Sequence, residues 1–229
     1  MTAIIAARNL EAGYGHVEVL RGINLHVEPG EIVALLGANG AGKTTTLLAL
    51  AGELPATSGV VEWHGNPTRA PLHRRAKSGL AFVLEERAVM GTLSVRDNLR
   101  LGRGSVERAL KLAPELEPLL NRRGGLLSGG EQQILTLARA LAAEPELLLV
   151  DELSLGLAPL IVERLLDAIQ SAAQAGMAVL LVEQQARNAL KRSSRAYIMA
   201  RGQVVLEGQS PDLLRKLPEI ESLYLAGVA

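Results

Sequence analysis

The chain has 229 residues, of which 48% are hydrophobic and 2% aromatic, so it can bury an aliphatic core in one large α/β domain or two small ones. Lys and Arg together number 24, as do Asp and Glu, and this balance argues against nucleic acid as a partner and against direct attachment to anionic lipid. The absence of cysteine excludes disulfides, a thiolate nucleophile and a cysteine zinc site.

The sequence shows neither a targeting segment nor a membrane segment. Its N-terminal residues lack the basic start and long apolar stretch of a signal peptide. No apolar run approaches the roughly 18 residues that a membrane span needs. We therefore expect a cytoplasmic protein that is soluble when isolated and is held at a membrane only through a partner.

Short strand-like segments bounded by glycines occupy the first third of the chain. Some alternate in polarity around a turn, which is typical of antiparallel strands, and others are continuous apolar runs, which are typical of buried strands. The predicted strands are residues 3–10, 17–27, 31–37, 59–65 and 79–85. A helical run follows the third strand and stops at Gly52.

The middle of the chain, about residues 86–140, is rich in Leu, Ala and Arg and predicts helices joined by loops. The last of these helices has the clearest start. Ser128 is a good N-cap, and Glu131 three residues later completes a capping-box pattern. Apolar residues then recur at helical spacing, at Ile134, Leu137, Ala138 and Leu141.

Strands and helices alternate again in the last third. The predicted elements are strands at 146–152 and 177–183, a helix at 158–175, and a hairpin at 195–208 that turns at Arg201–Gly202. Ser210 and Pro211 predict the N-cap and the first position of a last helix. The alternation predicts a mostly parallel sheet that the helical middle segment interrupts.

The segment GANGAGKTT, residues 37–45, matches the phosphate-binding pattern G-x-x-x-x-G-K-[ST]. It follows a predicted strand and opens a predicted helix, which is the context that the pattern requires. We expect backbone N–H groups to surround a phosphate, Lys43 to reach the β- and γ-phosphates of ATP, and the Thr44 hydroxyl to bind Mg²⁺. The expected nucleotide-binding residues are Gly37, Ala38, Asn39, Gly40, Ala41, Gly42, Lys43, Thr44 and Thr45.

Two carboxylates follow the apolar strand ELLLV. Alone, such an acidic pair is most often a solvated strand end. Next to a phosphate loop, it predicts a catalytic pair, because ligand sites of α/β folds lie at the carboxyl ends of strands. Asp151 would hold Mg²⁺ through water, and Glu152 would be either the base or the group that positions the attacking water.

Three motifs in one order, GANGAGKTT, then LSGGEQQ at 127–133, then LLLVDE, resemble those of the ABC transporter ATPases over nearly the whole chain. The resemblance implies an α/β P-loop NTPase fold with a mostly parallel core sheet, an antiparallel N-terminal β-subdomain and an inserted α-helical subdomain. It further implies a single ABC ATPase domain over 1–229, with core and β parts at 1–85 and 141–229 and the helical part at about 86–140.

The same resemblance implies a second half-site for ATP. In that family the signature segment binds the γ-phosphate of the nucleotide on the opposite chain, and two chains close around two ATP molecules. The corresponding residues are Ser128, Gly129, Gly130 and Glu131. Tyr14 resembles the aromatic residue that stacks on adenine, although a plain turn tyrosine is the alternative. Residues 154–158 resemble the loop that crosses the dimer interface.

Two positions differ from the general family pattern. Where a glutamine is expected after the strand at 79–85, the chain has Glu85, with Glu86 as the alternative position. Glu85 could ligate Mg²⁺ and contact the attacking water. Where a histidine is expected after VLLVE, the chain has Gln184, whose amide can donate to the γ-phosphate but does not titrate near neutral pH.

These departures, together with SLGLAP, resemble the LivF-type ATPases of branched-chain amino acid importers, a subgroup shared with urea and short-amide importers. The resemblance implies transmembrane permease subunits, an extracytoplasmic solute-binding protein, a place on the cytoplasmic face of the membrane, and a homodimer or a heterodimer with a sister ATPase. Val89, Met90 and Leu93 are candidates to receive a permease helix or, equally, ordinary core residues. The alternatives are another transporter ATPase, a soluble ABC ATPase without a transport role, and a non-hydrolysing subunit.

Overall fold

A computed structural model describes residues 2–84, 88–153 and 157–226. The predictions for Glu85, Glu86 and Ser154 therefore lie outside the described residues. None of the helices in the described ranges combines the length and the apolar character that crossing a bilayer requires.

The larger of two sheets forms the centre of the molecule. Its six strands run in the order β10-β9-β3-β8-β7-β6, and all neighbours are parallel except β10 on β9, which confirms the prediction of a mostly parallel sheet. The strands are β3 (Ile32–Gly37), β6 (Leu80–Val83), β7 (Leu147–Asp151), β8 (Ala178–Glu183), β9 (Arg195–Ala200) and β10 (Gln203–Gln209). Residues of β3, β7 and β8 are buried throughout, because helices or the second sheet cover both faces.

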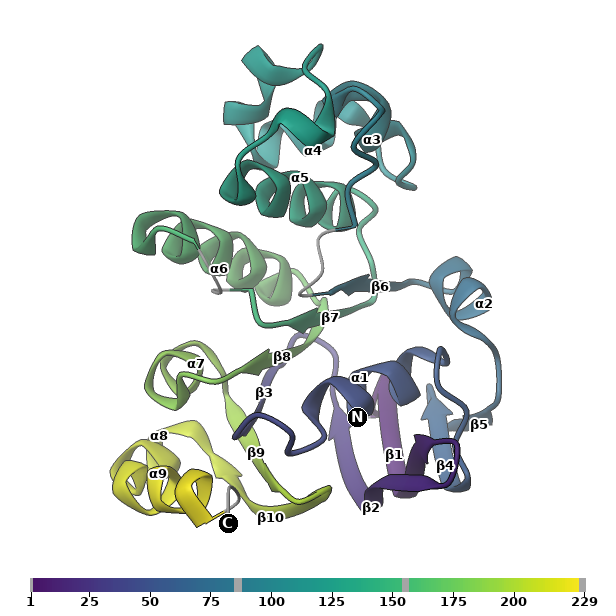
Figure 1. Ribbon diagram of the computed structural model, residues 1–229, viewed down its shortest axis with the longest axis vertical. Coiled ribbons are helices and arrows are strands. Elements are labelled where there is room, and N and C mark those ends of the chain that lie inside the picture. The colour runs from purple at the N-terminus through teal and green to yellow at the C-terminus, as the bar shows by residue number, and fades with distance from the viewer. Residues whose placement is uncertain (1, 85–87, 154–156, 227–229) are drawn as a thin grey trace.

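The second sheet is antiparallel, with strand order β2-β1-β4-β5. Its strands are β1 (Ile5–Tyr14), β2 (Val17–Val27), β4 (Ser58–Trp63) and β5 (Asn66–Thr68). Helix α1 (Lys43–Ala51) lies between the two sheets, and its Leu47 and Leu50 share one core with Val33 and Leu35 of β3 (Figure 1). The predicted antiparallel N-terminal strands are thus confirmed.

The other face of the central sheet is covered by the helices of the C-terminal third. Ala34 and Leu36 of β3 pack against α7 (Ala186–Arg192), α8 (Ser210–Arg215) and α9 (Leu217–Ala226). Helix α6 (Pro159–Gln174) packs with α5 (Gly129–Leu141) in a further core that reaches the sheet through Leu148 and Val179.

A helical lobe stands at the top of Figure 1. It consists of α3 (Val95–Arg100), α4 (Val106–Leu112), two 3₁₀ turns at Pro114–Leu119 and Gly124–Leu126, and α5 (Gly129–Leu141). Leu99, Leu116 and Leu135 fill its core. The expected helical insertion between β6 and β7 is therefore present.

Some short elements differ from the sequence predictions. The pattern did not predict β5, α2 (Leu72–Lys77) or α7, and the single last helix is in fact two, α8 and α9. Ser210 is not the cap of α8, since Gln209 takes that position. The Ser210 hydroxyl instead lies 2.8 Å from that of Ser193, and the residue is buried, so its side chain is committed to tertiary packing.

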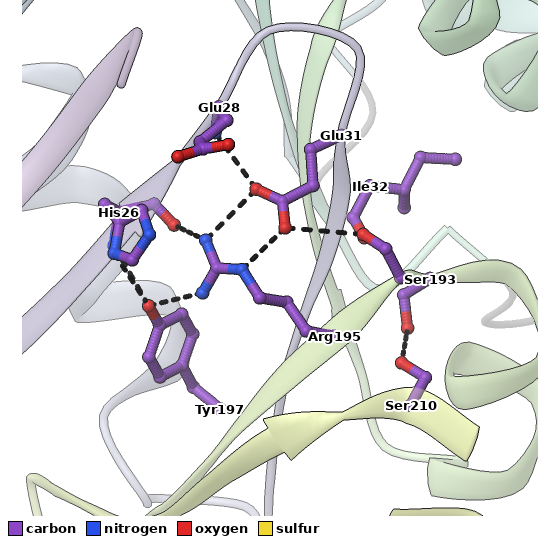
Figure 2. A network of polar contacts seen from close by, with 9 residues as sticks. His26, Glu28, Glu31, Ile32, Ser193, Arg195, Tyr197 and Ser210 are labelled. Atoms are coloured by element: carbon purple, nitrogen blue, oxygen red, sulfur yellow. Dashed lines mark hydrogen bonds and ion pairs between the residues drawn. The ribbon is translucent and has the colours of Figure 1, made fainter. Parts of the chain in front are cut away.

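A polar network joins the two sheets at the end of β3 away from the phosphate loop (Figure 2). Arg195 on β9 donates to both carboxylate oxygens of Glu31, at 2.5 and 3.1 Å, and also to the backbone oxygen of His26 at the end of β2. The Tyr197 hydroxyl accepts from Arg195 and from the His26 backbone N–H. Burial lowers the pKa of Arg195, but the hydrogen bonds and charges of Glu31 and Tyr197 outweigh it and raise that pKa above its usual value, so the guanidinium is charged.

We expect Arg195→Met to destabilise the fold without touching the phosphate loop. The Arg195 and Glu31 side chains are each 15% exposed, so the substitution leaves a largely buried carboxylate without its cation. The expected loss of about 3 kcal/mol lowers Tm by roughly 6–12 °C in thermal unfolding at pH 7. Arg215→Met is the control, because its pair with Asp212 is exposed and should contribute less than about 1 kcal/mol. Equal Tm values for the two variants would contradict the structural role of the network.

Candidate functional site

The loop between β3 and α1 forms a nest of backbone groups at the carboxyl end of the central sheet. Gly40 and Gly42 have φ angles of 78° and 102°, a conformation that L side chains rarely adopt. Lys43 opens α1 and is only 5% exposed, and its ammonium donates to the carbonyls of Gly37 at 2.9 Å and Ala38 at 3.1 Å. The Lys43 ammonium is therefore buried beside the loop, where an entering anion could replace the two carbonyls as its hydrogen-bond acceptor.

The turn between β9 and β10 is hydrogen-bonded to this loop and supports it. The Gly202 N–H donates to the Ala41 carbonyl at 3.0 Å, and the Gly202 carbonyl accepts from the Arg21 N–H at 2.8 Å. A Cβ at Gly202 would lie 1.9 Å from the Val19 carbonyl oxygen, so only glycine fits here. The predicted turn at Arg201–Gly202 thereby ties the antiparallel sheet to the phosphate loop.

Glu152 follows β7 directly and has a φ of 45°, which is unusual for a residue with a side chain. Its N–H donates to the Val182 carbonyl at 3.0 Å, so the neighbouring strand β8 holds the turn. Such a conformation costs about 1–3 kcal/mol and persists where the surroundings impose it, most often at functional sites. In this conformation the Glu152 carboxylate lies at the sheet edge that carries the phosphate loop.

Three predicted catalytic residues lie together at this edge. The Gln184 amide, just after β8, donates to one oxygen of Glu152 at 2.7 Å. The other Glu152 oxygen lies 3.9 Å from the ammonium of Lys43. Gln184 therefore orients the carboxylate, while Lys43 balances its charge.

The candidate metal ligands flank this group. Asp151 is the last residue of β7 and is 1% exposed, whereas Thr44 lies in the first turn of α1 and is exposed. In the ranges 2–84, 88–153 and 157–226, no cluster of three His, Cys, Asp or Glu side chains could hold a metal ion by itself. The Thr44 hydroxyl and the Asp151 carboxylate suit Mg²⁺, which binds through one or two protein oxygens, waters and substrate phosphates.

The first turn of α5 is a second place where backbone donors are free of helical partners. The predicted capping box is confirmed: Ser128 Oγ accepts from the Glu131 N–H at 3.3 Å, and the Glu131 carboxylate accepts from the Ser128 N–H at 2.6 Å. These bonds hold the pKa of Glu131 below its usual value, so the cap is ionised at neutral pH and weakens only in acid. Ser128 itself is exposed.

The signature turn and the phosphate loop do not meet within one chain. In Figure 1, α6, β6 and β7 lie between α5 and α1. A Cβ at Gly130 would lie 3.6 Å from Leu157 and 3.7 Å from Ile161, so the signature turn packs beside the start of α6 and the residue range just before it. Of the loop predicted at 154–158, residues 154–156 lie outside the described residues.

Tyr14 ends β1 and is 51% exposed. The partner strand of its hairpin, β2, approaches the phosphate loop, because Leu20 lies next to Gly42.

The candidates for a partner surface differ in exposure. Met90 is half exposed, whereas Val89 and Leu93 are partly buried and Val89 packs on the core of the helical lobe. Of these three candidates for a partner surface, Met90 is the one that is open to solvent.

Asn98 is a residue that sequence reasoning missed. It is fully buried and organises residues 90–94 through its side-chain amide. The available signal was its position: it shares the inward face of a short helix with Val95 and Leu99, the other buried residues of that helix, and both of these are apolar. A polar residue on such a face needs partners, which points to a local structural task.

Comparisons with known proteins agree with the motif order. A family model described as ABC transporter matches residues 20–154. BraG of Pseudomonas aeruginosa, a high-affinity branched-chain amino acid transport ATP-binding protein, is 38% identical over 93% of this chain and 96% of BraG. LptB of Escherichia coli, a lipopolysaccharide export system ATP-binding protein, is 34% identical over 97% of each chain. A solved dimeric structure of MJ0796, a bacterial ABC transporter cassette, has a TM-score of 0.81 and 25% identity, and covers 90% of this chain and 98% of that one.

Proposed function

This chain belongs to the ABC transporter family and is the ATP-hydrolysing subunit of a transporter, and we propose that this transporter takes up branched-chain amino acids. The observation that carries the solute class is the 38% identity to BraG over almost the full length of both chains. Export is the second candidate, because LptB aligns over an equal span at 34% identity. Gln184 at the switch position, where a histidine is general in the family, favours the importer subgroup.

On ATP binding, we propose that Lys43 leaves the carbonyls of Gly37 and Ala38 for the β- and γ-phosphates. The N–H groups of residues 37–45 then surround the β-phosphate, and the α1 N-terminus adds its partial positive charge. Tyr14 stacks on the adenine from the neighbouring hairpin. Glu152, released from Lys43 but still hydrogen-bonded to Gln184, accepts a proton from the attacking water.

Mg²⁺ fits the oxygen donors at the sheet edge. Thr44 would bind it directly, Asp151 through water, and Glu85 is proposed as a further ligand. When bound, the ion neutralises charge that builds up on the phosphates. Each of these residues has an oxygen ligand of the kind that Mg²⁺ prefers. Asp151 ends β7 and Thr44 follows the loop after β3, so both lie at the carboxyl edge of the central sheet.

We propose that Ser128, Gly129 and Gly130 complete the ATP site of a second ATPase chain, with Glu131 holding their turn through the capping box. Support comes from their separation from α1 in the same chain, from the exposure of Ser128, and from the N–H groups of Gly129 and Gly130, which a first helical turn leaves without a partner inside the helix. The second chain is either another copy or a sister ATPase. Permease subunits would dock at exposed Met90 from the cytoplasmic face of the membrane, and a solute-binding protein would deliver the solute outside.

The pH dependence of ATP hydrolysis tests the role of Gln184. Because an amide does not titrate, kcat should show the same profile between pH 5.5 and 7.5 in the wild type and in Gln184→Ala. Gln184→His introduces a group that is protonated below about pH 6.5, so this variant should acquire an acid limb. An acid limb that is present in the wild type and vanishes in Gln184→Ala would contradict the assignment.

Solute uptake by whole cells tests the solute class. Deleting the gene in the source organism should lower uptake of radiolabelled leucine, isoleucine and valine, and the wild-type gene but not Glu152→Gln should restore it. Radiolabelled urea serves as the alternative solute. Unchanged branched-chain amino acid uptake, with a loss of urea uptake or a defect in the cell envelope, would assign the chain to another transporter.

A further inference from the structure

Two segments of the helical lobe pair in an antiparallel manner just before the signature turn. We call residues 88–94 the docking loop and residues 120–127 the lead-in. The Gly124 N–H donates to the Leu93 carbonyl at 2.8 Å, and the Gly125 N–H donates to the Gly91 carbonyl at 3.0 Å. Ser94 and Arg123 form a bridge between the same segments. The lead-in then continues directly into Ser128.

Asn98 closes the docking loop from within. Its Oδ1 accepts from the Met90 N–H at 2.8 Å. Its amide nitrogen donates to the carbonyls of Met90 at 3.0 Å, Ser94 at 3.0 Å and, more weakly, Leu93 at 3.3 Å. Because Asn98 has no exposed surface, these backbone groups have no easy replacement by water if the amide is lost.

The lead-in is in turn bound to the helix that begins at the signature turn. The Gln132 side-chain amide donates to the Gly124 carbonyl at 3.0 Å, and the Gln132 N–H donates to the Ser128 carbonyl at 3.0 Å. A Cβ at Gly124 would lie 2.6 Å from Val89 and 3.1 Å from the Asn98 amide, so the lead-in packs too closely here for any side chain at residue 124. At the other end of the docking loop, Arg139 of α5 donates to the Ala88 carbonyl at 2.6 Å.

We propose that Asn98 is a positioning residue for the Ser128–Gly130 half-site: it joins the docking loop and the lead-in into one body that sets where the signature turn lies. Docking loop, lead-in and the first turn of α5 then move together, so force applied at exposed Met90 reaches Ser128. The inference rests on the proposed composite ATP site. A misplacement of about 1 Å is enough to impair such a site, because its backbone donors must converge on one phosphate.

Two variants in the Glu152→Gln background test the proposal. Asn98→Asp keeps the acceptor for Met90 but sets a carboxylate oxygen against the carbonyls of Met90, Leu93 and Ser94. Gln132→Met removes only the donor to Gly124 from a partly exposed side chain. For each, the affinity for a fluorescent ATP analogue is measured at low protein concentration, and the dimer Kd is measured by sedimentation in saturating ATP.

Both variants should bind ATP within about twofold of the background, since the phosphate loop is untouched, while the dimer Kd rises at least about tenfold. Ser105→Ala is the matched control. The Ser105 side chain caps α4 by accepting from the Arg108 N–H at 3.1 Å. It lies in the same lobe but outside the relay, by which we mean the hydrogen bonds that join the docking loop, the lead-in and the first turn of α5. Ser105→Ala should leave the dimer Kd unchanged. A general loss of stability would lower ATP affinity, Tm and dimerisation together and in all three variants.

The outcomes separate this inference from the function on which it rests. If the Glu152→Gln background fails to dimerise in ATP, the composite site is wrong and this proposal falls with it. If the background dimerises and Gln132→Met dimerises equally well, the relay alone is wrong. Should Asn98→Asp fail to fold, Gln132→Met decides the question.

Discussion

Glu152→Gln should lower kcat for ATP hydrolysis at least about 100-fold, because a positioned general base contributes roughly 10²–10⁴. The amide has the same shape as the carboxylate and keeps an oxygen that can accept from Gln184, now at 2.7 Å from the carboxylate. It cannot take a proton from water. ATP affinity should therefore change little, and the measurement is steady-state phosphate release beside equilibrium ATP binding.

Glu53→Gln is the control for this substitution, since it neutralises an exposed carboxylate just after α1. Its turnover should equal that of the wild type. Turnover of Glu152→Gln within about threefold of the wild type would show that another group supplies the base, and the strained backbone at Glu152 would need a different explanation.

Lys43→Ala should weaken ATP binding at least about 100-fold, because it removes two charge-assisted hydrogen bonds to the phosphates. The ammonium is already buried and points into the loop in the structure, so little must be reorganised when ATP enters. The measurement is a titration with ATP followed by calorimetry, together with Tm to confirm that the variant is folded.

Lys77→Ala makes the same change at an exposed position on α2 and should bind ATP like the wild type. If Lys43→Ala is folded and binds ATP with wild-type affinity, the loop at 37–45 is not the phosphate site. That result would remove the basis for every other assignment at the sheet edge.

The parts of the site that the sequence predicted are those that local patterns define. The capping box at Ser128 and Glu131 needs only four consecutive residues, and it forms as predicted. The strand before the phosphate loop is a short apolar run, and β3 runs from Ile32 to Gly37. Both patterns carry their physical cause within one segment, so no tertiary contact can easily override them.

The features that were missed leave no clear signal within a single periodic segment. Helices α2 and α7 have six and seven residues, too few for a clear helical period. The sequence pattern makes Ser210 a helix cap, but its hydroxyl lies within hydrogen-bond distance of Ser193, 17 residues earlier in the chain. The positive φ of Glu152 is imposed from β8, and the four bonds of Asn98 close a loop rather than a helix.

The central claim is that the signature turn of one chain, Ser128–Gly130, completes the ATP site of another. The most direct test is the mass of Glu152→Gln by size exclusion with light scattering, with and without ATP. The account predicts a monomer of 24.3 kDa without nucleotide and a species of twice that mass in ATP, which Ser128→Arg abolishes while ATP still binds. A chain that binds ATP but stays monomeric at every protein concentration would contradict the claim.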